Sequence, residues 1–162
     1  MYTPVNIKPL FAIAALLSGL LASPASATEG SIKVHNPWIP EAPPVTKVHA
    51  AYMSLENSSN HEITLSGFSS STFKKIEIHQ IKSNQGMMKM MPLKELKIPA
   101  NSRIEFRPGG FHFMLTGSNQ PLRAEDKIDL TLIDSTGSKT TFLVPVKNSQ
   151  DLSGVAHSKH HH

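Results

Sequence analysis

Short apolar runs separated by turn-forming residues fill the chain after Ala27, and they limit what it can fold into. In one of them Ile76 and Ile78 alternate with polar residues, which is the period of a half-buried strand. Asn36 and Pro37 are expected to end the first strand, and the proline-rich segment 38–44 is expected to form an extended loop. The predicted strands are 31–35, 48–56, 62–68, 72–81, 87–91, 94–98, 103–106, 111–115, 127–133 and 140–146. Because no long helical period follows Ala27, the pattern predicts an all-β, antiparallel sandwich.

The N-terminus has the three regions of a secretory signal. Lys8 precedes the apolar stretch 10–22, and the small residues Ala25 and Ala27 then offer a cleavage site. An uncleaved membrane anchor is the alternative, but 13 apolar residues are fewer than the roughly 20 that a bilayer needs. No cysteine follows the stretch, so a lipoprotein anchor is not expected. The sequence therefore predicts a signal helix over 1–27, cleavage after Ala27, and a periplasmic protein without a membrane anchor.

The remaining chain has the length of one domain. Residues 28–148 are expected to form a β-sandwich, and 149–162 a flexible tail with little apolar content. The formal charge of +4 falls to +3 without Lys8, and no basic stripe with interleaved aromatic residues occurs. A nucleic-acid partner is therefore not expected, and the chain is predicted to be a monomer.

The chain contains no cysteine, seven methionines and nine histidines. The absence of cysteine excludes a dithiol oxidoreductase, a cysteine hydrolase and a thiolate metal site. It also argues against an electron-transfer cupredoxin, whose copper is held by two His, one Cys and a weak axial Met. No Ser-His-Asp grouping or His-Glu-x-x-His motif is present, so the sequence predicts a binding protein and not an enzyme.

Histidines and methionines between 78 and 114 form a candidate set of soft, neutral metal ligands. Residues i and i+2 of a strand share a face, so His112 and Met114 can address one ion. Thioethers select copper(I) over harder divalent ions, and imidazole suits copper in general. The methionine cluster 87–91 has an alternative role in core packing, because methionine fills irregular gaps.

The spacing His79, ten residues, Met90, twenty-one residues, His112, one residue, Met114 resembles the signature of the periplasmic copper chaperones called PCu(A)C. Segments 36–38, 50–53, 86–90 and 108–115 also lie where that family has similar segments. The resemblance implies a cupredoxin-like Greek-key sandwich that binds one copper(I) per monomer through His79, Met90, His112 and Met114 at an accessible edge. It further implies copper-donating or copper-accepting periplasmic partners and delivery to the binuclear copper site of cytochrome c oxidase.

The chain departs from this family at two places. Many members have arginine where this chain has Met91, which is expected in the core because it points away from Met90. A basic residue is common in the family where this chain has Ile39 and Pro40, so a partner contact at that loop is in doubt. Copper scavenging or storage in metal resistance is the alternative function, since it needs the same ligands as delivery.

The C-terminal tail is a second candidate metal site. It carries His157, His160, His161 and His162, and His-rich tracts bind borderline metals. A copper(II) site there and a functionally silent tail, such as a purification tag, both remain open. The other histidines, His35, His49 and His61, are expected to be surface or structural residues.

Overall fold

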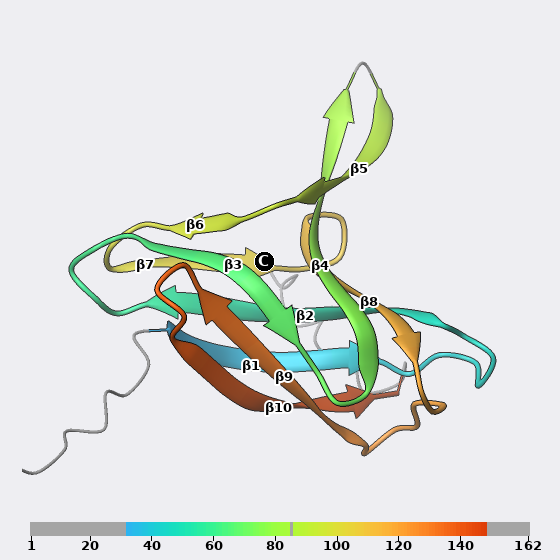
Figure 1. Ribbon diagram of the computed structural model, residues 1–162. Helices are drawn as coiled ribbons and strands as arrows, with labels where there is room; N and C mark the ends of the chain where they lie inside the picture. The colour runs from blue at the N-terminus through green and yellow to red at the C-terminus, as the bar shows by residue number, and fades with distance from the viewer. Residues whose placement is uncertain (1–31, 85, 149–162) are drawn as a thin grey trace, which may run out of the picture.

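The computed structural model describes residues 32–84 and 86–148 (Figure 1). The predicted signal helix over 1–27 and the tail 149–162 lie outside the described residues. The described part consists of ten strands and contains no helix long and apolar enough to cross a bilayer. The strands are β1 (Ile32–Pro40), β2 (Val48–Asn57), β3 (Ile63–Ser69), β4 (Phe73–Asn84), β5 (Met87–Leu93), β6 (Leu96–Ile98), β7 (Ser102–Phe106), β8 (Phe111–Ser118), β9 (Lys127–Asp134) and β10 (Lys139–Lys147).

The strands pair in the order β5-β4-β8-β7-β2-β1-β10-β9-β3-β6. The chain of pairings folds into two layers because β1 belongs to both. Its first part pairs antiparallel with β2, and Ile39 and Pro40 then pair parallel with β10. With a second parallel contact between β7 and β8, the sheet is mixed, although most pairs are antiparallel. The predicted all-β sandwich is confirmed.

The crossing of β1 corrects one expectation. Asn36 and Pro37 were expected to end the first strand, but β1 continues to Pro40 through an irregularity between His35 and Trp38. Asn36 has a φ of 47°, a left-handed conformation that asparagine tolerates better than most residues. The kink redirects the strand from one layer to the other instead of ending it.

A single buried cluster lies between the layers and includes Phe113 of β8, Leu55 of β2, Leu65 of β3 and Leu130 of β9. The ring of Phe113 stacks on Phe106 at 4.6 Å between centroids, and it meets Phe68 of the other layer edge-on at 5.4 Å. Burial of this apolar surface holds the two sheets together.

We call the layer of β5, β4, β8, β7, β2 and β1 the first sheet and the layer of β10, β9, β3 and β6 the second sheet. Two local features of the first sheet shape its edge at β4 and β5. Strands β7 and β8 lie end to end along β2, and the loop 107–110 between them reaches toward β4. Beyond Gln80, β4 pairs only with β5, so the hairpin projects from the body (Figure 1). We call this projection, residues 81–84 and 86–90, the arm.

Candidate metal centre

The pairing of β4 with β8 places three of the four predicted ligands on one face of the sheet. His79 lies directly opposite His112, and Glu77 lies opposite Met114. The intervening pair, Ile78 and Phe113, points to the core on the other face. Opposed residues of an antiparallel pair share a face, so His79, His112 and Met114 all point outward together.

Met90 reaches the same face from the arm. It lies opposite Ile81, two residues beyond His79 along β4, and therefore on the His79 side of the hairpin. Three strands, β4, β5 and β8, thus bring together four residues that are up to 35 positions apart in the sequence. The gathered side chains offer two imidazoles and two thioethers, which is a donor set suited to a soft, monovalent ion.

The two histidines form the buried centre of the group. Their ring centroids are 5.7 Å apart, and His79 and His112 are only 7% and 6% exposed. Both ring nitrogens of His79 are buried without a hydrogen-bond partner. A buried polar atom left unpaired costs stability, but such a nitrogen has a lone pair available for a metal ion. The ring of His79 therefore fits the role of a ligand.

The loop 107–110 orients the other imidazole. The carbonyl oxygen of Gly110 accepts the backbone N–H of Ile81 at 3.2 Å and lies 3.4 Å from Nδ1 of His112. With Nδ1–H directed at this carbonyl, Nε2 is left to accept a metal. Burial lowers the pKa of His112, against the opposing effect of the Gly110 contact, and the neighbouring His79 lowers it further. A neutral ring at pH 7 is the form that binds metal.

The sequence reasoning missed Glu77 and Gly110. A carboxylate oxygen of Glu77 lies 3.7 Å from Nε2 of His79, beyond hydrogen-bond length, and 2.9 Å from the ammonium of Lys75. The hydrogen bond from Lys75 lowers the pKa of Glu77 in spite of its partial burial. The period-2 pattern could have found Glu77, which precedes His79 by two positions. The role of the Gly110 carbonyl depends on the loop conformation, for which the sequence gives no signal.

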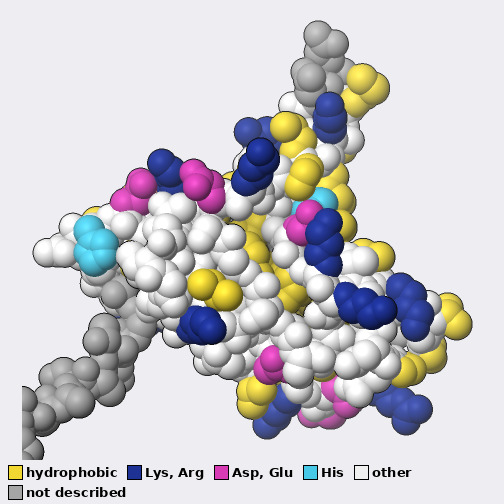
Figure 2. All heavy atoms as spheres, viewed as in Figure 1, with side chains coloured by type: hydrophobic (Ala, Val, Ile, Leu, Met, Phe, Trp, Pro, Cys, Tyr) yellow, Lys and Arg dark blue, Asp and Glu magenta, His cyan; other side chains and the backbone are white. Residues whose placement is uncertain are grey.

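The methionines of β5 are exposed, which corrects the expectation for Met91. Its side chain is 42% exposed, and Met87, Met88 and Met90 are 71%, 65% and 50% exposed. Met91 does point away from Met90, but it lies at the base of the arm on the edge strand β5, and its side chain is not covered there either. Figure 2 shows hydrophobic and Lys side chains gathered on the projecting hairpin. The alternative of core packing is therefore wrong for these four residues.

The other histidines occupy structural or surface positions. Nε2 of His35 is 3.0 Å from Glu56, which also binds Arg103. His61 is exposed, whereas His49 is buried with its ring against Phe73. Burial lowers the pKa of His49, against a smaller effect of the Thr46 backbone.

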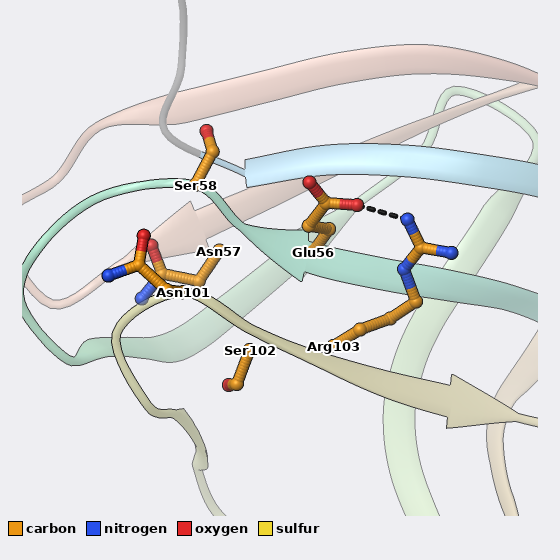
Figure 3. Close-up of a pocket in the computed structure, with 6 residues that line it drawn as sticks. All are labelled: Glu56, Asn57, Ser58, Asn101, Ser102 and Arg103. Atoms are coloured by element: carbon orange, nitrogen blue, oxygen red, sulfur yellow. Dashed lines mark hydrogen bonds and ion pairs between the residues drawn. The ribbon is translucent and has the colours of Figure 1, made fainter.

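An open pocket of about 350 Å³ lies beside the ion pair of Glu56 and Arg103 (Figure 3). Asn57 at its wall donates to the carbonyls of His61, Ile98 and Pro99. These bonds tie the end of β2 to the residues before β3 and to the end of β6, so this wall has a structural role. Within residues 32–84 and 86–148, no three His, Cys, Asp or Glu side chains cluster closely enough to hold a metal. The candidate centre on β4, β5 and β8 therefore depends on its thioethers.

The fold and this group of residues define a class: a β-sandwich of cupredoxin type with a His–Met cluster at the base of a projecting hairpin. Residues 32–146 match the family described as putative lipoprotein LpqE-like, and the chain belongs to this family. The chain is 34% identical to a putative lipoprotein of Leifsonia xyli subsp. xyli over 153 residues, which covers 88% of this chain and 89% of the relative. It is 30% identical to an uncharacterized protein of Rickettsia prowazekii over 127 residues, or 74% of this chain and 68% of the relative.

Solved structures agree with this assignment. The copper-bound PCuAC domain from PmoF2 superposes with a TM-score of 0.62 at 22% identity, covering 74% of this chain and 94% of that domain. The apo form of DR1885 from Deinococcus radiodurans gives 0.58 at 25% identity, covering 92% and 96%. The copper(I) form of DR1885 gives 0.54 at 25% identity, covering 76% and 84%. The resemblance to the PCu(A)C family that the sequence indicated is confirmed.

Proposed function

We propose that this protein is an exported copper(I) chaperone that binds one ion through His79, Met90, His112 and Met114. The observation that carries the proposal is the placement of these four residues on one face, with a buried and unpartnered imidazole at the centre. Two similar structures, a copper-bound PCuAC domain and a copper(I) form of DR1885, support the choice of metal.

The arrangement suits binding and delivery better than catalysis. The buried imidazoles would hold the ion at a fixed position with neutral ligands. The half-exposed thioether of Met90 leaves one side of the site accessible to another protein. Neither thioether carries a proton, so ligand exchange at sulfur needs no acid or base. Copper is the cargo, and this protein's residues hold it and release it without changing its oxidation state.

A copper(I) titration of the full chain tests the site. The double variant H112A/M114A should lose affinity by at least about 100-fold, because two of four ligands are gone. Competition with a copper(I) chelator under anaerobic conditions measures this loss. The variant H35A removes a histidine outside the group and should bind like the wild type. One tightly bound equivalent in H112A/M114A would show that the ligands lie elsewhere.

We further propose that the copper is delivered toward the binuclear site of cytochrome c oxidase, through copper-donating or copper-accepting periplasmic partners. Deleting the gene should lower oxidase activity when copper is scarce. Normal oxidase activity together with greater copper sensitivity would favour scavenging or storage instead. Delivery and storage require the same ligands, so copper binding cannot distinguish them. The two phenotypes of the deletion can.

We also propose that the protein is exported and that its C-terminal tail binds copper(II). The signal pattern over 1–27 and the description of a relative as a putative lipoprotein support an exported protein, and the absence of cysteine favours release after cleavage. We propose that the domain 28–148 works in the periplasm as a monomer. The tail histidines 157 and 160–162 would add a weaker copper(II) site. Removing residues 150–162 should then weaken copper(II) binding and leave copper(I) binding intact, and equal copper(II) binding would show the tail to be silent.

A further inference from the structure

The arm carries a thioether, that of Met88, to which the four-residue site assigns no role. Met88 lies opposite Ser83, and Met90 lies opposite Ile81, so both methionines share the face that holds His79. Positions i and i+2 of a strand are ~7 Å apart along its axis, within reach of two flexible methionine side chains. Met88 is thus the next soft donor outward from the proposed ligand Met90.

Exposure rises steadily along this face. The histidines at its base are 6–7% exposed, Met90 is 50% exposed and Met88 is 65% exposed. Among the described residues, four of the seven exposed large hydrophobic side chains belong to β5. Exposed apolar side chains gathered on an ordered strand mark a site of interaction. By contrast Met53, which serves packing, is 2% exposed.

Copper(I) leaves a multidentate site by exchanging one ligand at a time. A donor beside the site can form a Cu–S bond while a bond to Met90 or a histidine breaks, so the ion is never released bare into water. The exchange moves no electron and no proton, since the ion stays copper(I) and a thioether has no proton to lose. The hydroxyl of Ser83, the cross-strand neighbour of Met88, is a hard donor and competes poorly for a soft ion.

We infer that Met88 is an exchange ligand, which contacts copper(I) during entry and departure but does not hold it at rest. This inference rests on the proposed copper(I) site and adds to it a path along one face of the arm. The ion passes from the partner to Met88, then to Met90, and from there to the buried imidazoles.

The arm provides a matched control for the test. Met87 lies opposite Asn84 on the other face of the same hairpin, and its exposed fraction of 71% is close to that of Met88. The variants M88L and M87L keep the apolar character and the approximate volume of the side chain while removing the sulfur. Any effect of hydrophobicity or strand propensity is then common to both variants, and only M88L removes a donor from the ligand face.

The experiment measures equilibrium affinity and transfer rate separately. Full-length M88L should keep the wild-type copper(I) affinity within about twofold. Its rate of copper(I) transfer to a chromophoric chelator, followed by anaerobic stopped flow, should fall by about threefold or more. M87L should match the wild type in both measurements.

Two outcomes would overturn the inference. Equal transfer rates for M88L and M87L would show that Met88 takes no part in exchange. A loss of equilibrium affinity in M88L as large as that in M90L would make Met88 a resident ligand. Failure of the wild type itself to bind copper(I) would instead overturn the proposed function, so the two failures are distinguishable.

Discussion

The two faces of β8 show how neighbouring residues of one strand serve opposite purposes. Phe113 and Leu115 point into the core and are completely buried. His112 and Met114 alternate with them and point to the opposite face of the sheet. The inner face of β8 is filled by apolar side chains that need no hydrogen bond, whereas the ring nitrogens of His79, opposite His112 on the outer face, have no hydrogen-bond partner. Unmet bonding capacity does not by itself mark the site, because the ring nitrogens of His49 in the core also lack a partner; what sets the site apart is that His79 shares one face with His112 and Met114.

The methionines differ in the same way between the core and the candidate site. Met53 on β2 is buried in the core, while the four methionines of β5, three of them on the arm, are exposed. Residue type does not decide between these roles, because methionine packs as well as it binds soft metals. The difference comes from β5 pairing with β4 on one side only and extending beyond the second sheet.

The largest loss of stability is expected from a substitution on the inner face of β8. The variant F113A removes a ring that contacts Phe106 and Phe68, and it should lower the free energy of unfolding by about 3–5 kcal/mol. Urea denaturation of the apo protein measures the loss. A change below about 1 kcal/mol would mean that the two sheets do not depend on this contact.

A substitution on the outer face should not lower the stability of the apo protein, in contrast to F113A. In H79L a leucine replaces a buried ring whose nitrogens have no hydrogen-bond partner, so the apo protein should be as stable as the wild type or more stable by about 1 kcal/mol. The same variant should lose tight copper(I) binding. Denaturation and chelator competition on one preparation check both expectations. Clear destabilisation of apo H79L would show that this histidine serves the scaffold.

The smallest effect is expected far from the site, in the second sheet. Asp129 accepts hydrogen bonds from the hydroxyl and the backbone N–H of Ser71, and these bonds lower the pKa of its carboxyl group. The folded protein therefore binds this proton less readily than the unfolded chain. The stabilisation is complete above the usual pKa of an aspartate and disappears as the pH falls through the lowered value.

Accordingly, the stability of the wild type should fall more steeply than that of D129N between about pH 5 and about pH 3. Thermal melts across this range measure the difference. Copper(I) affinity at neutral pH should be equal in the two proteins, because Asp129 lies in the other sheet. If the stability of the wild type and that of D129N fell equally over this pH range, the hydrogen bonds of Asp129 would not contribute to stability.

Much of the fold could be predicted because alternation along a strand is a local property. The ends of most strands lie within a few residues of those expected, and the alternation around Ile78 identified its buried side correctly. The path of β1 could not be predicted, since Asn36 and Pro37 ordinarily end a strand. The strand predicted over 87–91 continues through Pro92 to Leu93, because an edge strand tolerates the missing N–H of a proline.

For the candidate site, the spacing that resembles the PCu(A)C signature proposed His79, Met90, His112 and Met114 as ligands, and the strand pairing places these four residues on one face. The exposure of Met91 was predicted wrongly, because the sequence does not show where a hairpin leaves the core. Glu77 was within reach of the period-2 argument, but the orienting carbonyl of Gly110 was not.

The sequence by itself determined the strands, the residue types available for a soft metal, and the pairing of His112 with Met114 on one face. These depend on periodicity and composition, which are properties of short segments. Only the tertiary structure decided that His79 meets His112 across β4 and β8, that the loop 107–110 aims a carbonyl at His112, and that β5 stands clear of the core. The reason is physical: register and exposure depend on which distant segments pack together, and packing is decided by the whole chain.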